Sequence, residues 1–168
     1  GHENEYALER NQEPDHEPAR NPCPAPAAGS CLTVRASSGL SGDMMLAGLA
    51  LMCGASQSDL DADVAALGLP ALVGALSLER RSVNQVAGWG CRITLPHEHA
   101  HRNMRDIAKI IEQSAMDKHA AELAQKTFAL LAEAEGAVHG LAPHDVVFHE
   151  VGALDSILDI CLACRFFL

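Results

Sequence analysis

Residues 31–54 read CLTVRASSGLSGDMMLAGLALMCG, and this stretch sets the fold class. Its first seven residues are β-prone, the glycine-bearing loop SGLSGD follows at residues 38–43, and an apolar helical stretch closes at Gly54. This order predicts a strand, a tight loop and a helix. A strand that leads into a helix is typical of a domain that combines both element types.

The next segments predict one more helix and two more strands. The helix is expected from an N-cap at Ser58 to Gly68. The sequences LSLERRSV (76–83) and WGCRITLP (89–96) alternate apolar with polar residues across a short connection, which is typical of an antiparallel pair. Together with the strand expected at residues 31–37, they predict a small mixed sheet.

The last third of the chain is predicted to be mainly helical. Apolar residues at helical spacing mark one helix over residues 104–111 and a longer one over 123–138, and both are expected to cover one face of the sheet. A short extended piece (146–151) precedes a final helix from about Asp155 that is almost entirely apolar. Such a helix has to be buried, and because the sequence stops at Leu168 we expect the natural protein to continue.

Composition predicts one folded domain behind a tail. Residues 1–29 combine acidic residues with proline and have almost no apolar residue that could pack, which predicts a disordered tail. Residues 30–168 hold most of the apolar residues of a chain that is 48% hydrophobic, enough for a core. The predicted fold class is α/β (α+β), with a small mixed sheet and helices packed against it.

Charge and hydropathy limit the partners and the location. The formal net charge of −10 argues against a nucleic acid or an anionic membrane as partner, because both attract a surplus of Lys and Arg. The first residues lack the pattern of an export signal, and the longest apolar run, residues 44–53, is about half of the ~20 residues that cross a membrane. We therefore expect a soluble, cytoplasmic protein with reduced cysteines. Cys161 and Cys164 are expected to be core thiols, with metal ligation as the alternative.

The loop at residues 38–43 is the first candidate site. It lies between the predicted strand and helix, where free backbone N–H groups and the positive end of the helix dipole can receive an anion. Its glycines permit positive φ and the close approach of a ligand. Phosphate binding there is a hypothesis, and the alternative is that Ser41 or Asp43 only caps the helix. The candidate cofactor-binding residues are Gly39, Ser41, Gly42 and Asp43.

A run of three histidines is the second candidate site. His97, His99 and His101 alternate along the chain, so in an extended segment their imidazoles project on one side and can converge on one ion. Imidazole binds nickel, zinc and copper, and the spacing does not choose among them. A solvated loop is the alternative. Because metal ligands must be neutral, acid should release a bound ion.

The third candidate site is the segment HEVGALDSILD at residues 149–159. It places His149 and Glu150 ahead of the final helix. On that helix Asp155 and Asp159 lie four residues apart and so share a face. Such a cluster can hold a hard divalent ion or position a base. The alternative is that Asp155 caps the helix and Asp159 is a solvated or paired acid.

Three motifs together resemble one known family. They are SGLSGDM (38–44), the histidine run that leads into HRNMRDI (101–107), and LAEAEGAVHG (131–140) followed by VFHEVGALDSILDI (147–160). In this order they resemble the LarC family, the nickel-insertion proteins of nickel-pincer cofactor synthesis. The last motif is long and specific, and the similarity spans about residues 31–168.

The resemblance implies an activity and its reactants. LarC proteins insert nickel into pyridinium-3,5-bisthiocarboxylic acid mononucleotide, forming Ni–S and Ni–C bonds, in a reaction that consumes CTP and uses manganese. The resemblance therefore implies a lyase-class enzyme, here its amino-terminal portion, that serves lactate racemase or a related apoenzyme and forms a homo-oligomer. Family members are longer, and nucleotide and nickel binding are largely attributed to a carboxyl-terminal domain, so this portion can be inactive alone.

Some positions of this chain match the family pattern and others depart from it. The matching positions are Gly42, Asp43, His149, Glu150, Gly152, Asp155 and Asp159. The chain departs from the family's aspartate, aromatic residue and histidine at Arg35, Ser37 and Val147. The candidate catalytic residues are Asp43, His149, Glu150 and Asp155. The candidate metal ligands are His97, His99, His101, His149 and Asp159.

Two other functions stay open at this point. A non-enzymatic nickel chaperone or store would hold the metal on the histidine run and pass it on without nucleotide turnover. A scaffold would only dock the carboxyl-terminal domain. CTP hydrolysis coupled to nickel insertion separates the enzyme from the chaperone. Loss of insertion in an Asp43→Ala or His149→Ala variant that still folds and docks would exclude the scaffold.

Overall fold

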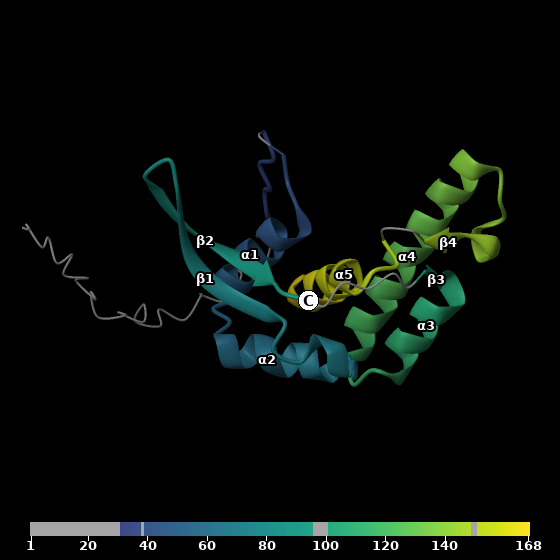
Figure 1. Ribbon diagram of the computed structural model, residues 1–168, viewed down its shortest axis with the longest axis horizontal. Coiled ribbons are helices and arrows are strands. Elements are labelled where there is room, and N and C mark those ends of the chain that lie inside the picture. Colours follow the sequence, from purple (N-terminus) through teal and green to yellow (C-terminus); the bar gives the residue numbers. More distant parts are fainter. Residues whose placement is uncertain (1–30, 38, 96–100, 149–150) are drawn as a thin grey trace, which may run out of the picture.

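The structure, a computed structural model, describes residues 31–37, 39–95, 101–148 and 151–168 (Figure 1). The tail expected at residues 1–29 lies outside them. The helices and turns of the described part are α1 (Gly42–Met52), α2 (Gln57–Ala66), η1 (Pro70–Leu72), α3 (Met104–Gln113), α4 (Lys118–His139), η2 (Pro143–Asp145) and α5 (Leu154–Phe166). Its strands are β1 (Leu76–Val83), β2 (Val86–Ile93), β3 (Arg102–Asn103) and β4 (Val147–Phe148). The predicted α/β class, with helices packed against a small sheet, is confirmed.

The β1–β2 hairpin is the main sheet. It is antiparallel, with a register that runs from Leu76 opposite Ile93 to Val83 opposite Val86. The two residues of its turn, Asn84 and Gln85, both have positive φ (50° and 66°). A two-residue turn of this kind matches the right-handed twist of the strands it joins. The antiparallel pair predicted from alternation is confirmed.

The strand predicted at residues 31–37 is wrong. These residues are exposed and form no strand in the structure. A β-prone segment becomes a strand only where a neighbouring strand satisfies its backbone groups, and within the described residues none pairs with it. The second sheet is instead the short antiparallel pair of β3 and β4, with Arg102 opposite Phe148. The predicted mixed sheet is thus two separate antiparallel pairs.

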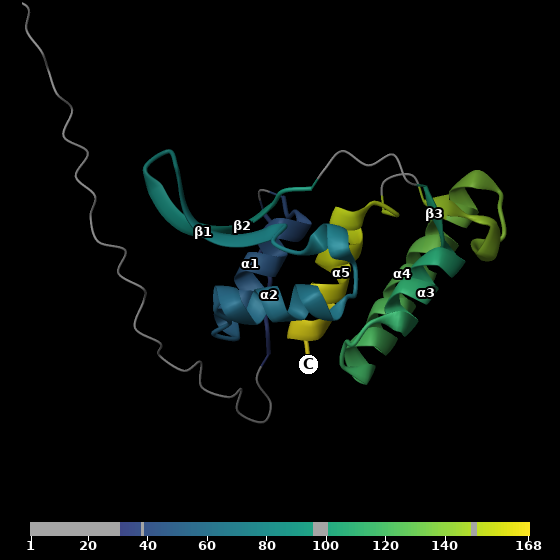
Figure 2. The ribbon, with the colours of Figure 1, turned by 60° about the horizontal axis from the view of Figure 1, so that its bottom comes forward.

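The helices divide between two sides of the molecule. α1 packs against β2 and α2 against β1, whereas α3 packs on α4 at the other side (Figures 1 and 2). The prediction that the helices at 104–111 and 123–138 cover the sheet is therefore wrong, because α1 and α2 occupy that place. α2 also begins earlier than predicted, since Ser56 rather than Ser58 is its N-cap and forms a capping box with Asp59.

Helix α5 forms the centre of the core. It lies between α1 and α4 (Figures 1 and 2) and also contacts α2. Seven of its side chains are buried: Leu154, Ile157, Leu158, Cys161, Leu162, Cys164 and Phe166. The predicted burial of this apolar helix is confirmed, but helices of this same chain provide it. The expectation that a further segment is needed to bury α5 is therefore wrong.

Five of the six cysteines lie in the described part of the chain. No disulfide joins any two of the five cysteines that the structure describes: Cys31, Cys53, Cys91, Cys161 and Cys164. The CxxC pair on α5 is buried, as predicted for core thiols. Within the described ranges, no helix combines the length and the apolar character that a membrane crossing requires.

Candidate functional site

A pocket of about 600 Å³ lies where α1, the β1–β2 hairpin and the start of α5 meet. Its polar lining consists of Ser41, Asp43, Arg81, Arg92, Asp155 and Asp159. Gly42 also lines it. The pocket therefore brings together residues of the first and third candidate segments, which are more than a hundred residues apart in the chain.

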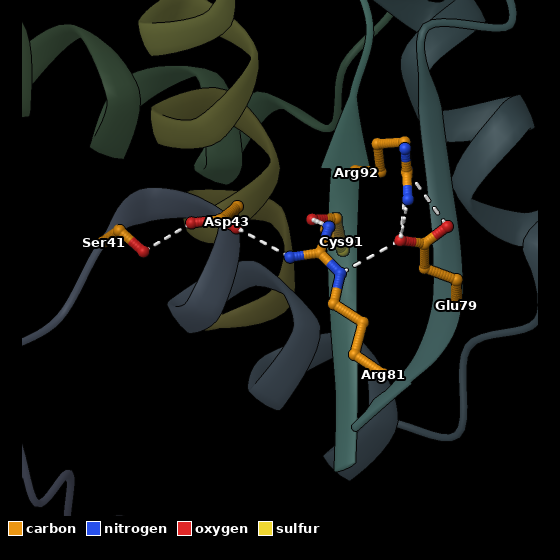
Figure 3. Close-up of polar contacts among 6 residues, drawn as sticks. All are labelled: Ser41, Asp43, Glu79, Arg81, Cys91 and Arg92. Carbon is orange, nitrogen blue, oxygen red and sulfur yellow. Dashed lines mark hydrogen bonds and ion pairs between the residues drawn. The ribbon is translucent and has the colours of Figure 1, made fainter. Parts of the chain in front are cut away.

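The start of α1 contributes Ser41, Gly42 and Asp43. Ser41 occupies the N-cap position but makes no side-chain hydrogen bond to the backbone of the helix. Its hydroxyl donates instead to the Asp43 carboxylate (Figure 3). Ser41 therefore has the position of a helix cap but does not form the capping hydrogen bond. The first turn of α1 keeps backbone N–H groups that its N-cap side chain does not satisfy.

The start of α5 contributes two carboxylates. Asp155 lies in the first turn, where one oxygen accepts a hydrogen bond from the backbone N–H of Ser156 at 2.8 Å. Ala153, not Asp155, is the N-cap residue, so the alternative that Asp155 caps the helix is wrong. Asp159 lies one turn further along, directly against the backbone of Gly42. Two helix starts and two carboxylates of α5 therefore share one pocket.

Asp159 has an unusual environment. Its Oδ1 atom is fully buried and, among the residues described, makes no hydrogen bond. Burial, followed by the negative charges of Asp43 and Asp155, raises the pKa of Asp159 to about 6. The carboxyl group of Asp159 therefore holds a proton over a wider pH range than an exposed aspartate.

Arg81 reaches the pocket from β1 by crossing β2. Its side chain lies over Gly90, where a Cβ atom would be only 3.0 Å from Arg81 Cδ. Nη2 donates to the carbonyl oxygen of Cys91 at 2.6 Å, and Nε donates to Glu79 at 3.0 Å. Nη1 lies 3.7 Å from Asp43 Oδ2 (Figure 3). These contacts fix the guanidinium group at the wall of the pocket.

Glu79 holds both arginines of the pocket. Arg92 donates to it through Nη2 at 2.9 Å and Nε at 3.1 Å, in addition to the bond from Arg81 (Figure 3). The hydrogen bonds from Arg92 and then Arg81 lower the pKa of Glu79. Glu79 therefore stays ionised and keeps the two guanidinium groups side by side.

Cys91 lines the same pocket from β2. It is fully buried, and burial, with the charges of Asp159 and Asp43, raises its pKa to about 11. Its thiol is therefore neutral at physiological pH and is a poor metal ligand, because metals bind the thiolate.

The two other candidate residues that the structure describes do not line the pocket. Gly39 has the positive φ (95°) expected of the loop but does not line the pocket. His101 is exposed, immediately precedes β3 and does not line it either. Four candidates lie outside the described residues: His97, His99, His149 and Glu150. Across the described part of the chain, no group of three His, Cys, Asp or Glu is placed to hold a metal ion.

Sequence reasoning missed the pocket residues Arg81, Cys91 and Arg92, together with four apolar residues of the lining. A signal for the arginines was present, because alternation places Glu79 and Arg81 on one face of β1. The cross-strand register then adds Gly90 and Arg92 to that face. What the sequence lacked was the position of α1 beside the hairpin.

Comparison with known proteins points to one family. A family model described as nickel insertion protein matches residues 32–167. The pyridinium-3,5-bisthiocarboxylic acid mononucleotide nickel insertion protein of Akkermansia muciniphila is 42% identical over 134 residues, which cover 74% of this chain and 32% of that protein. The protein of the same name from Staphylococcus saprophyticus is 34% identical over 131 residues, covering 75% of this chain and 32% of that protein.

The matches cover most of this chain but only part of each relative. This chain spans about a third of the length of the curated relatives that it resembles. The matched region of the family model contains every described residue of the pocket. No solved structure matches the chain significantly.

Proposed function

We propose that this chain, which belongs to the nickel insertion protein family, uses its pocket to bind pyridinium-3,5-bisthiocarboxylic acid mononucleotide during nickel insertion. The observation that supports this most is the convergence of Asp43, Asp155 and Asp159 on one pocket. These carboxylates come from the two motifs that most resemble the family. A pocket of about 600 Å³ also lies within the range that holds small molecules and cofactors.

The charges of the pocket suit the two reactants. Nickel is a divalent cation and is the cargo of the reaction, and a pyridinium ring carries a fixed positive charge. The carboxylates of Asp43 and Asp155 are proposed to attract both and to hold them for the reaction. Asp159 is proposed to contact the incoming metal from the floor of the pocket. His149 and Glu150 are proposed to act with them, as the resemblance implies.

Metal binding in this proposal is transient. Among the described residues, no group of three His, Cys, Asp or Glu side chains is placed to hold a metal ion. Carboxylates of the pocket and a substrate that itself carries sulfur groups would share the coordination of nickel.

The wider reaction is proposed for the complete protein, because the match covers only about a third of the relatives' length. We propose that CTP turnover, with manganese, involves the carboxyl-terminal domain, and that the reaction takes place in the cytoplasm. The chain is proposed to work as part of a homo-oligomeric, lyase-class enzyme. Its product would pass to lactate racemase or a related apoenzyme.

A chimera tests the proposal. This chain replaces the matching third of the Akkermansia muciniphila protein, and the chimera receives the mononucleotide, Ni²⁺, CTP and Mn²⁺. We expect nickel-bearing product in the mass spectrum, CTP consumption, and loss of both in an Asp43→Asn variant that folds normally. Glu133→Gln, an exposed change on α4, is the matched control and should be active.

Other outcomes would support one of the two alternative functions. Nickel transfer without CTP consumption would support the chaperone function, in which the histidine run at residues 97–101 holds the metal. Full activity of both the Asp43→Asn and the Asp155→Asn chimeras would exclude the pocket as the reaction site. The chain would then be a scaffold for the carboxyl-terminal domain.

A further inference from the structure

Arg81 is fixed in place but keeps hydrogen-bonding capacity at the pocket. Its Nε and Nη2 atoms make short bonds to Glu79 and to the Cys91 carbonyl oxygen. Its Nη1 atom has only the 3.7 Å ion pair with Asp43, which is longer than a hydrogen bond. Among the described residues, the two N–H groups of Nη1 therefore have no acceptor at hydrogen-bond distance. A guanidinium group that is held in place and keeps N–H groups for a ligand is well suited to bind an anion.

Arg92 extends the same wall of the pocket. Its Nε and Nη2 atoms bind Glu79, and the structure shows no hydrogen bond from its Nη1 to a described residue. Since one Glu79 carboxylate is shared by two guanidinium groups, this wall carries a net positive charge. Neither guanidinium has to move far to bind an anion, because Glu79 already holds both.

The opposite wall is negative. Asp43, Asp155 and Asp159 face the pocket from α1 and α5. The charges of the pocket are thus separated into a cationic side on the hairpin and an anionic side on the helices, as Figure 3 shows for Arg81 and Asp43. A ligand that carries one charge only would leave one of the walls unmatched.

We propose that the pocket takes a zwitterionic ligand in one fixed orientation, with its anionic group on Arg81 and Arg92 and its cationic ring against Asp43 and Asp155. Arg81 is then a positioning residue that sets which end of the ligand faces α1. The inference rests on the proposed function in taking a pyridinium mononucleotide as the ligand. The anion that Arg81 binds is a phosphate or a ring carboxylate, and these have the same charge chemistry at this wall.

Titration calorimetry on the chain with four probes tests the orientation. Nicotinamide mononucleotide carries the cationic ring and a phosphate, nicotinamide riboside the ring alone, nicotinic acid riboside the ring and a carboxylate, and inorganic phosphate the anion alone. We expect the mononucleotide to bind at least about tenfold more tightly than nicotinamide riboside and than phosphate, because each of these two leaves one wall unpaired. If nicotinic acid riboside equals the mononucleotide, the arginine wall accepts either anion and the orientation is retained.

Variants separate a specific contact from a general loss of charge. Arg81→Met should weaken the mononucleotide about tenfold, to the level of nicotinamide riboside, and leave nicotinamide riboside unchanged. Arg81→Lys should restore part of the loss. Arg105→Met, which removes an exposed arginine on α3, is the matched control and should bind like the unaltered chain. Circular dichroism of each variant confirms folding.

Several results would overturn the orientation. They are equal affinity for the mononucleotide and nicotinamide riboside, an unchanged affinity in folded Arg81→Met, and no measurable mononucleotide binding at millimolar concentration. If Arg81→Met does not fold, Arg92→Met provides the same comparison. Binding that depends on Arg81 in an inactive chimera would refute the proposed function alone, whereas an active chimera without this dependence would refute only the orientation.

Discussion

Gly42 and Asp159 approach each other so closely that a Cβ atom on Gly42 would lie 2.6 Å from Cγ of Asp159. We expect Gly42→Ala to lower the free energy of unfolding by about 1–3 kcal/mol, because the added methyl overpacks the contact between α1 and α5. Urea denaturation measures the change. Gly48→Ala is the control on the same helix: a Cβ there meets nothing within 4 Å, so alanine should stabilise by about 0.5–1 kcal/mol.

A double variant tests the cause. In an Asp159→Ala background the space beside Gly42 is open, so we expect Gly42→Ala to destabilise much less than in the unaltered chain. The comparison requires all four proteins to unfold in a two-state transition. A destabilisation of the same size in both backgrounds would show that the contact with Asp159 is not its origin.

The raised pKa of Asp159 gives a pH dependence of stability. Between the ordinary value of 3.8 and about 6, the folded state holds more protons at Asp159 than the unfolded state does. The contribution of Asp159 to the free energy of unfolding therefore falls as pH rises through this window. Asp159→Asn removes this loss and should stabilise the chain by about 1–2 kcal/mol at pH 7, after allowance for solvent screening.

Urea denaturation of both proteins from pH 4 to pH 8 measures this difference. We expect the two stability curves to separate between about pH 4 and pH 6 and to run parallel above it. Glu133→Gln, on the exposed surface of α4, controls for the general loss of a negative charge. A constant difference between Asp159→Asn and the unaltered chain at all pH values would contradict the shifted pKa.

Thiol labelling should divide the cysteines into two groups. Cys31 and Cys53 are exposed, whereas Cys91 and Cys161 are buried and have pKa values raised to about 11 and about 12. At pH 8 we expect iodoacetamide to label the exposed pair in the native chain, and the buried pair only in urea. Peptide mass spectrometry reads out each site. Rapid native labelling of Cys91 would mean that the pocket opens far more than the structure shows.

The start of α2 offers a direct comparison of two serines. Ser56 caps the helix and shares a capping box with Asp59, whereas Ser58 lies in the first turn. Ser56→Ala should lower the free energy of unfolding by about 1 kcal/mol, because it removes the side-chain bond to the Asp59 backbone N–H. Ser58→Ala should have no destabilising effect, since alanine is the better helix former. The reverse order in thermal denaturation would place the cap at Ser58.

Local patterns were sufficient to predict most elements. The apolar spacing predicted α1, α3, α4 and α5, and alternation predicted the β1–β2 pair, because each of these patterns reflects a face that the element buries. The end of α4 followed from Gly140, whose positive φ of 68° closes the helix.

The predictions that were wrong or missing all concern contacts between residues that are far apart in the sequence. The β-prone segment at residues 31–37 has no strand partner, which no local pattern reveals. The pocket includes Arg81 because Gly90, on the neighbouring strand, leaves room for its side chain to cross. The sequence also suggested Asp43 and Asp159 as separate candidates, whereas their meeting depends on how α5 packs beside α1.

The central position of α5 has a consequence for motion at the site. The helix that supplies Asp155 and Asp159 also supplies seven side chains of the core, so it cannot move away from the pocket without disrupting the whole domain. Its amide protons should therefore exchange with solvent only through global unfolding. The arginines on the hairpin are partly exposed, but Glu79 holds both of their guanidinium groups in place. The pocket thus combines an immobile floor with a wall of preset charges, so a ligand should bind with little change of shape.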